Sequence, residues 1–154
     1  DIFFKYLQTG KYEPKPSLQT LANAMDVGDP SNFARIIDLY KGSWDAIRTD
    51  ISGASYNDAA IRQTMQTCYT QVGYILDPHG ACGYRALKEQ LNDGETGIFL
   101  ETAHPAKFKE KVDEILSTDI KIPERLQAFM CGKRQTIRLS ADYEALKELL
   151  MDKH

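Results

Sequence analysis

The sequence has 154 residues, of which 42% are hydrophobic, and a formal net charge of −3. A chain of this length can bury the core of one domain, and none of its apolar runs is long enough to span a membrane. Basic and acidic residues are mixed along the whole chain, which argues against a grip on the phosphates of DNA or RNA. We therefore expect one compact unit over 1–154, with neither a membrane nor a nucleic acid as partner.

The cysteines point to a reducing compartment. The chain has three of them, an odd number, and no CxxC pair. This pattern argues against a disulfide framework and against a structural zinc site. We predict no metal site and a cytoplasmic location.

The first part of the chain should be helical apart from one extended stretch. Residues 2–7 form a short apolar element that Gly10 ends, and two prolines keep 11–20 extended. Asp29 and Pro30 have the pattern of an N-cap and the first residue of a helix. The apolar residues behind them recur at helical spacing and indicate core packing, with a break allowed at Gly42: Phe33, Ile36, Ile37, Tyr40, Trp44 and Ile47.

The middle of the chain alternates between helical and strand-like patterns. A helix capped by Ser55 or Asn57 should end at Gly73, two short apolar runs predict strands at 74–76 and 97–100, and 136–139 should form an edge strand. Further helices should follow Asp77, start at Pro105 and Pro123, and follow a cap at Ser140. Alternation of this kind predicts an α/β fold, mostly helices around a few parallel strands in an incomplete sheet.

The most informative stretch is 101–108, because it places polar groups at the end of a predicted strand. Thr102, His104 and Lys107 supply a hydroxyl, an imidazole and an ammonium there. Ligands of open α/β folds bind at the carboxyl edge of the sheet, and a helix start suits an anion. The sequence therefore predicts a polar, phosphate-friendly site, without identifying its ligand.

Three segments of the chain, in register, resemble threonine synthase. The first begins at Phe4-x-x-Leu7-x-x-Gly10-x-Tyr12-x-Pro14 and continues to Pro30-Ser31-Asn32-Phe33-x-Arg35. The second is Gly73-Tyr74-x-x-Asp77-Pro78-His79, continuing to Tyr84-Arg85-Ala86-Leu87. The third is Thr102-Ala103-His104-Pro105-Ala106-Lys107-Phe108. Their order and spacing are similar to the C-terminal portion of that family.

The resemblance implies an enzyme of fold type II that depends on pyridoxal 5'-phosphate (PLP), with the cofactor between two α/β domains. It also implies a carbon–oxygen lyase acting on phosphate, which makes L-threonine and phosphate from O-phospho-L-homoserine and water. The family's Schiff-base lysine and Gly-rich phosphate loop lie in its N-terminal portion, and no motif of this chain matches them. We therefore expect a C-terminal fragment that neither catalyses nor binds PLP alone, and that self-associates through an apolar patch near 2–7 or along 97–100.

The resemblance also assigns roles to single residues. Thr102 matches the hydroxyl that faces the pyridine nitrogen of PLP, while the alternative is a threonine that caps the next helix. His104, Lys107 and Asn32 are candidates for substrate binding, with Lys107 placed to meet a phosphate. Each of them has a plainer alternative as a surface or capping residue, as has Asp26, and no catalytic residue is assigned within the chain.

Two other functions compete with this interpretation. One is a non-catalytic α/β module that binds a small phosphorylated ligand at the helix starts near His79 and Pro105. The other is a related fold-type-II lyase that acts on another phosphorylated amino acid.

Overall fold

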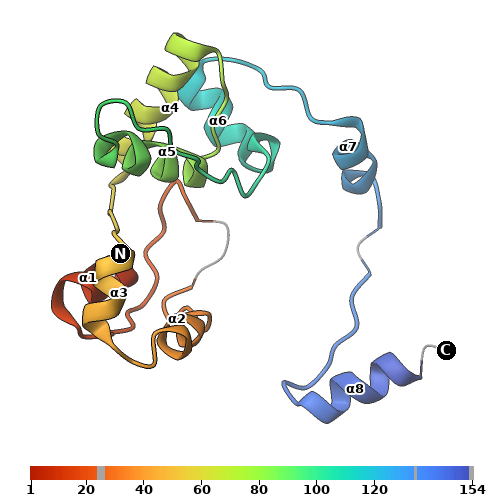
Figure 1. Cartoon of the computed structure of the whole chain (residues 1–154). Coiled ribbons are helices and arrows are strands. Elements are labelled where there is room, and N and C mark those ends of the chain that lie inside the picture. The colour runs from red at the N-terminus through yellow and green to blue at the C-terminus, as the bar shows by residue number, and fades with distance from the viewer. Residues whose placement is uncertain (24–26, 134, 153–154) are drawn as a thin grey trace. The chain divides into compact units, whose positions relative to one another are not determined.

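The computed structural model describes residues 1–23, 27–133 and 135–152. All regular elements within these residues are helices, and the chain divides into two units, Asp1–Lys121 and Ile122–His154 (Figure 1). The single compact unit predicted over 1–154 stays a prediction, and each unit is described by itself. Among the described residues, no helix has both the length and the apolar character of a membrane span.

The first core of Asp1–Lys121 lies between short helices. They are α1 (Ile2–Thr9), α2 (Phe33–Leu39) and α3 (Trp44–Asp50). Tyr6, Leu7 and Ile47 are its buried centre, and the predicted apolar stripe packs around them, which confirms that it is core. Gly10 ends α1 at a φ of 72°, a conformation that favours glycine.

The start of α2 differs from the prediction. The helix begins at Phe33 rather than Pro30, and Asn32 precedes it without capping it through its side chain. Asp29 Oδ1 accepts a hydrogen bond from the Tyr12 hydroxyl instead (2.8 Å). The expected break is confirmed, since Gly42 at a φ of 75° separates α2 from α3.

A second group of helices builds the part of the unit that carries the site. These are α4 (Asp58–Val72), α5 (Pro78–Gln90), the 3-10 helix η1 (Pro105–Phe108) and α6 (Lys109–Leu116). α4 packs against α5 and α6, and η1 packs against α6. Met65 of α4 and Val112 of α6 are fully buried between them. As predicted, Asn57 caps α4 and Gly73 ends it.

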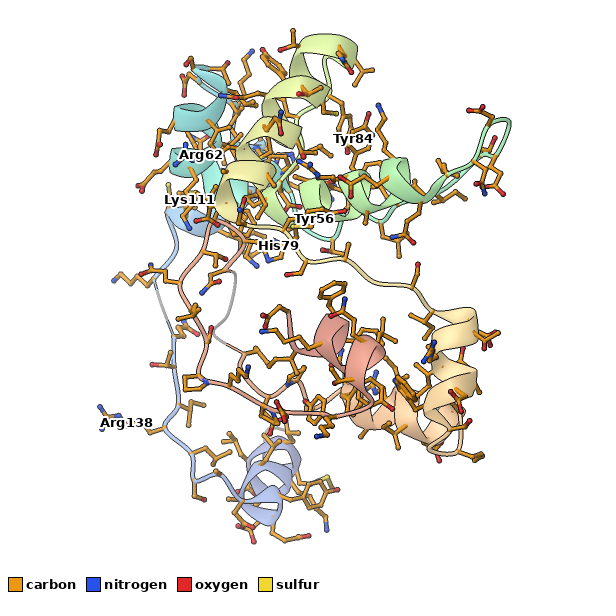
Figure 2. All side chains as sticks on the ribbon, turned by 90° about the vertical axis from the view of Figure 1, so that its left-hand side faces the viewer. Tyr56, Arg62, His79, Tyr84, Lys111 and Arg138 are labelled. Atoms are coloured by element: carbon orange, nitrogen blue, oxygen red, sulfur yellow. The ribbon has the colours of Figure 1, made fainter. Side chains whose placement is uncertain are left out.

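Polar contacts on the outside of these helices add little to their stability. Arg62 of α4 pairs with Glu114 of α6 at 2.8 Å, and Lys111 donates to the carbonyl of Thr20 at 3.1 Å (both basic residues are labelled in Figure 2). Exposed ion pairs of this kind contribute about 0–1 kcal/mol. The buried apolar side chains therefore hold the helices together.

The predicted α/β fold is wrong, because none of the described residues forms a strand. Residues 74–76 and 97–100 do not pair with each other. The N–H of Asp77 donates to the Glu101 carboxylate rather than to a backbone carbonyl, and Gly97 packs on the side chain of Leu87. An apolar run becomes a strand only when another strand lies beside it, and the described residues provide none.

Side chains in the 97–100 run alternate between exposed and half-buried, as in a strand, although none of the described residues pairs with this run as a second strand. Ile98 and Leu100 are 87% and 77% exposed, whereas Phe99 between them is half-buried. The apolar patch predicted along 97–100 is therefore present. The alternative patch at the start of the chain is not, because Leu7 is buried there and Phe3 packs against the first core.

The described residues of the unit Ile122–His154 form two helices, and none of these residues is buried. The helices are α7 (Glu124–Met130) and α8 (Tyr143–Met151). Asp142, not Ser140, caps α8 by accepting the N–H of Ala145 at 3.2 Å. The predicted strand at 136–139 is also absent from the described residues.

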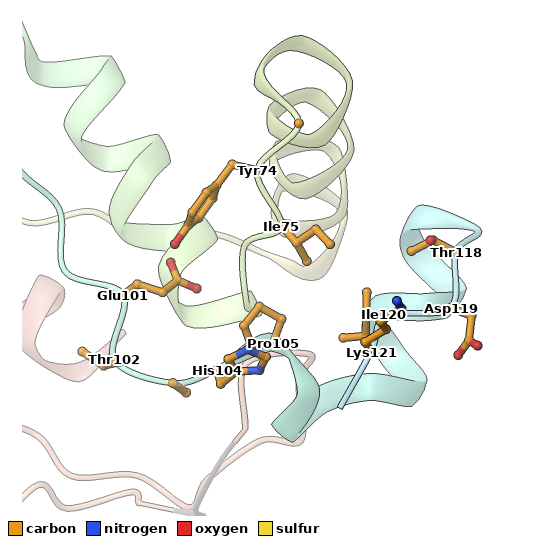
Figure 3. Close-up of a pocket in the computed structure, with 12 residues that line it drawn as sticks. Tyr74, Ile75, Glu101, Thr102, His104, Pro105, Thr118, Asp119, Ile120 and Lys121 are labelled. Carbon is orange, nitrogen blue, oxygen red and sulfur yellow. The ribbon is translucent and has the colours of Figure 1, made fainter. Parts of the chain in front are cut away.

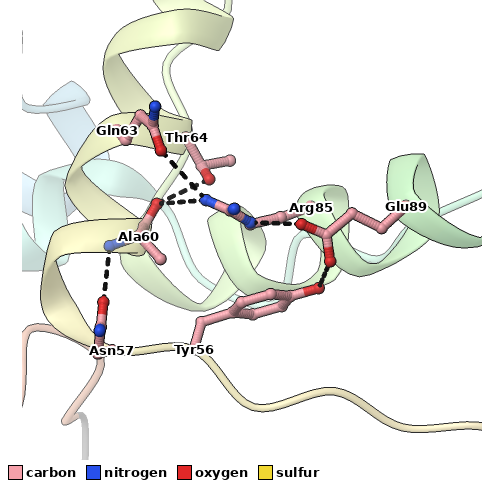
Figure 4. Close-up of polar contacts among 7 residues, drawn as sticks. All are labelled: Tyr56, Asn57, Ala60, Gln63, Thr64, Arg85 and Glu89. Atoms are coloured by element: carbon pink, nitrogen blue, oxygen red, sulfur yellow. Dashed lines mark hydrogen bonds and ion pairs between the residues drawn. The ribbon is translucent and has the colours of Figure 1, made fainter.

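A polar network fastens the segment before α4 to α5 (Figure 4). The Tyr56 hydroxyl donates to Glu89 at 2.6 Å, and Arg85 donates from Nε to the same carboxylate at 2.7 Å. Burial, followed by the bond to Glu89, raises the pKa of Tyr56 to about 12. The tyrosine is thus held as a neutral donor.

We expect Tyr56→Phe to lower the free energy of unfolding by about 1 kcal/mol, because it removes one hydrogen bond to a carboxylate. Urea denaturation measures this loss. Tyr69→Phe is the control, since Tyr69 is exposed on α4, and its effect should stay within about 0.5 kcal/mol. Equal losses in the two variants would contradict a role for the network.

Candidate functional site

A cavity of about 780 Å³ lies where three segments of the unit Asp1–Lys121 meet (Figure 3). Its walls come from residues 73–75, 101–105 and 118–121. Thr102 and His104, two of the residues that the sequence analysis proposes for a site, both line it. The cavity lies between helices rather than at the edge of a sheet.

Thr102 is exposed in this cavity, and its hydroxyl has no hydrogen-bond partner among the described residues. The alternative role as a helix cap is taken by another residue, since the N-cap of η1 is His104. A hydroxyl can both donate and accept a hydrogen bond. The Thr102 hydroxyl is therefore available to either kind of polar atom on a ligand.

One nitrogen of the His104 ring already makes a hydrogen bond within the chain. Its Nδ1 accepts the N–H of Ala106 at 3.1 Å. A ring whose Nδ1 accepts carries its proton on Nε2 when neutral. His104 thus offers the cavity an N–H donor at Nε2.

Lys107 and Asn32 do not line the cavity with Thr102. Lys107 is exposed, and its ammonium lies 5.8 Å from the centre of the Phe108 ring. Asn32 is exposed at the start of α2, in the other group of helices. Asp26, the remaining candidate, lies outside the described residues.

The wall at 118–121 is fixed by α6. The Lys109 ammonium bonds to Asp113 at 2.6 Å, to Asp119, and to the carbonyl of Ile120 at 2.9 Å. Asp113 in turn accepts the N–H of Ile120 at 2.9 Å, which with Lys109 lowers the pKa of its carboxyl. These contacts connect the wall to a helix whose inner face is buried. Sequence reasoning missed this wall, because its residues carry no motif.

The wall at 101 rests on Asp77, which the sequence analysis used only to mark the start of a helix. The Asp77 side chain is 0% exposed, and its Oδ1 accepts the N–H of His79 at 2.7 Å as the N-cap of α5. Glu101 Oε1 accepts the N–H of Asp77, also at 2.7 Å. The sequence signals the cap through Asp77-Pro78 but gives no sign of a partner 24 residues away.

At both helix starts predicted to bind an anion, a side chain of the chain itself already accepts a backbone N–H. At α5 the Asp77 carboxylate already occupies the capping position, with His79 Nδ1 at 3.0 Å. At Pro105 the helix is a 3-10 turn of four residues, and the N–H of Ala106 in its first turn donates to His104 Nδ1. Neither start presents a row of free N–H groups, so the binding capacity of the site rests on the side chains in the cavity.

Comparison with known proteins decides the family. Residues 80–150 match the family model described as threonine synthase, C-terminal. The threonine synthase of Escherichia coli strain K12 is 39% identical over 152 residues, 99% of this chain and 35% of the relative. The chain is homologous to the C-terminal region of threonine synthases.

Other threonine synthases support this relationship. That of Haemophilus influenzae is 45% identical over 127 residues, which are 82% of this chain and 29% of that protein. The crystal structure of the Escherichia coli enzyme superposes with a TM-score of 0.78 at 38% identity, over 100% of this chain and 36% of that one. A structure described as PLP-bound threonine synthase from Brucella melitensis, 24% identical, has the same fold over 99% of this chain and 38% of its own, with a TM-score of 0.77. The chain thus spans about a third of the length of these threonine synthases.

Proposed function

We propose that this chain supplies the C-terminal region of a threonine synthase, a PLP-dependent lyase that converts O-phospho-L-homoserine and water to L-threonine and phosphate. The homology with the Escherichia coli enzyme, which extends over 99% of the chain, carries this proposal. The cavity supports it, because it collects a hydroxyl, an imidazole N–H and a carboxyl group in one place.

The residues of the cavity fit one part of PLP. A pyridine nitrogen needs a polar partner, and the Thr102 hydroxyl has none within the described chain. A hydroxyl is a weaker acid than an ammonium and a weaker base than a carboxylate, so it leaves the ring nitrogen mostly unprotonated. When bound, PLP supplies an electron sink for the reaction. The neutral hydroxyl of Thr102 would hydrogen-bond to the pyridine nitrogen of PLP and so keep that ring uncharged at nitrogen.

His104 and Lys107 would serve the substrate in different ways. His104 lines the same cavity, and its Nε2–H would orient a substrate oxygen beside Thr102. Lys107 lies outside the cavity and would attract the phosphate as an exposed charge rather than hold it. Asn32 would act from the start of α2, in the other group of helices of the unit.

We further propose that the part of the enzyme outside this chain, about two-thirds of the length of its relatives, supplies the lysine that binds PLP covalently and the loop that binds its phosphate. The chain then has no activity by itself. Its exposed Ile98 and Leu100 would give it a tendency to self-associate when it is alone. A cytoplasmic location stays a prediction.

The test is a direct assay of the protein that carries this chain. We expect it to show the visible absorption of an internal PLP adduct and to release phosphate and threonine in equal amounts from O-phospho-L-homoserine. L-Homoserine, which lacks the phosphate, is the matched control and should yield nothing. The 154-residue chain alone should be inactive. Absence of both PLP and phosphate release in the carrying protein would contradict the proposal.

A further inference from the structure

Two carboxyl groups meet behind the cavity. Asp77 is 0% exposed, its N–H donates to Glu101 Oε1 at 2.7 Å, and the two carboxyl groups are close enough to interact electrostatically. One oxygen of each group, Asp77 Oδ2 and Glu101 Oε2, is buried and has no hydrogen-bond partner among the described residues. Two oxygens that can only accept cannot satisfy each other.

A single proton resolves this arrangement. Two ionised carboxylates in contact repel each other, and burial disfavours both charges. With one proton between them, one group becomes a donor and the other an acceptor, which satisfies both buried oxygens.

We propose that Glu101 and Asp77 share one proton, and that this carboxyl pair positions Thr102 by holding residue 101 on the N-terminus of α5. The shared proton is independent of the proposed function, whereas the positioning of Thr102 as a cofactor contact rests on it.

The fold makes room for this pair at Gly80. A methyl group at Gly80 would lie 2.5 Å from Cδ of Glu101 and 2.6 Å from its Oε1, far inside van der Waals contact. The carboxyl of Glu101 therefore occupies the space that any other residue at position 80 would fill. Because Thr102 follows Glu101 directly, the position of the Glu101 carboxyl against Gly80 also fixes where Thr102 enters the cavity.

Several titratable groups surround the pair. On α5, His79 Nδ1 lies 3.0 Å from Asp77 Oδ1, whereas Asp77 Oδ2 has no partner among the described residues. The Tyr74 hydroxyl points toward the Glu101 carboxyl in Figure 3. The other groups that face the pair are Cys82 of α5, Cys68 of α4 and His104 of the cavity wall. The two thiols have raised pKa values, chiefly through burial, and so add no charge near neutral pH.

Glu101 should titrate near neutral pH. Burial first, and then the neighbouring carboxyl group of Asp77, raise the pKa of Glu101 from its ordinary value of 4.5 to about 7, although the hydrogen bond from the Asp77 N–H acts in the opposite direction. Since this pKa is higher in the folded than in the unfolded state, the stabilisation is fully present below pH 4.5 and is lost as the pH rises through about 7. Relative to Glu101→Gln, which cannot titrate, the free energy of unfolding should therefore fall across this window.

Infrared spectroscopy of the protein that carries this chain tests the shared proton without substrate or cofactor. At a pH between 4.5 and 7 we expect the carbonyl band of a protonated carboxylic acid, carried by isotope-labelled glutamate and absent from Glu101→Gln. Asp77→Asn keeps the helix cap but offers an N–H donor to an ionised Glu101, so the titration midpoint should move to lower pH. A wild-type spectrum without this band, or the same band in Glu101→Gln, would overturn the proposal.

Hydrogen exchange of the Asp77 amide tests the positioning. Its N–H donates to Glu101, so exchange should be at least tenfold faster in Glu101→Ala and in Gly80→Ala, and near wild type in Glu101→Gln, whose amide oxygen still accepts. Gly83→Ala is the matched control on α5, because its nearest neighbour would be Phe99 Cβ at 4.0 Å. The backbone signals of Thr102 and His104 should shift with the Glu101 titration in the wild type and not in Glu101→Gln. Unchanged exchange in Glu101→Ala, or Thr102 signals that ignore the titration, would refute the positioning role whatever the enzyme's activity.

Discussion

Replacing Thr102 by valine should lower kcat/KM for threonine formation about 5- to 150-fold in the protein that carries this chain. Valine keeps the shape of threonine but removes the hydroxyl, which would leave the pyridine nitrogen of PLP without its partner. A buried polar atom left unpaired costs about 1–3 kcal/mol, and that cost sets the range. Steady-state phosphate release measures it.

Two further variants separate the hydroxyl from its surroundings. Thr102→Ser restores the hydroxyl and should recover most of the activity. Thr118→Val removes another hydroxyl from the opposite wall of the same cavity and should change kcat/KM less than twofold. If Thr118→Val were as damaging as Thr102→Val, the loss would reflect the cavity as a whole and the role of Thr102 would be wrong.

The helices were predictable because their signals are local. Asn57 caps α4 and Gly73 ends it within the segment that contains the helical pattern, and Trp44 continues the stripe that begins at Phe33. Caps and apolar periods act within a few residues, so a single sequence reveals them. The prediction failed where a local cap competed with a distant partner, as when Tyr12 engages the carboxylate of Asp29.

Strands were not predictable because they depend on partners distant in sequence. Ile98 and Leu100 alternate with Phe99 as strand residues do, yet the described residues place no strand beside them. The same dependence explains the site. Thr102 and His104 are two residues apart and share the cavity, whereas the contact between Glu101 and Asp77 arises only when the chain folds.

Leu76→Ala should lower the free energy of unfolding by about 2–5 kcal/mol. Leu76 is 0% exposed in the segment between α4 and α5, and truncating a buried leucine loses its transfer free energy and leaves a cavity. Urea denaturation of the protein that carries this chain measures the loss. Leu39→Ala, at a leucine that is 72% exposed, is the control and should cost less than about 0.5 kcal/mol.

The effect of Leu76→Ala should also reach the site, because Leu76 immediately precedes Asp77. A looser segment at Leu76 weakens the hold on the Asp77 amide, so we expect that amide to exchange faster in Leu76→Ala as well. Thr102→Val, in contrast, removes an exposed hydroxyl without a partner and should leave the free energy of unfolding within about 0.5 kcal/mol. We thus expect Leu76→Ala to lower stability and disturb the site, and Thr102→Val to lower activity alone. This result would distinguish a residue that builds the cavity from a residue that contacts its ligand. Equal losses of stability in the two variants would contradict this division.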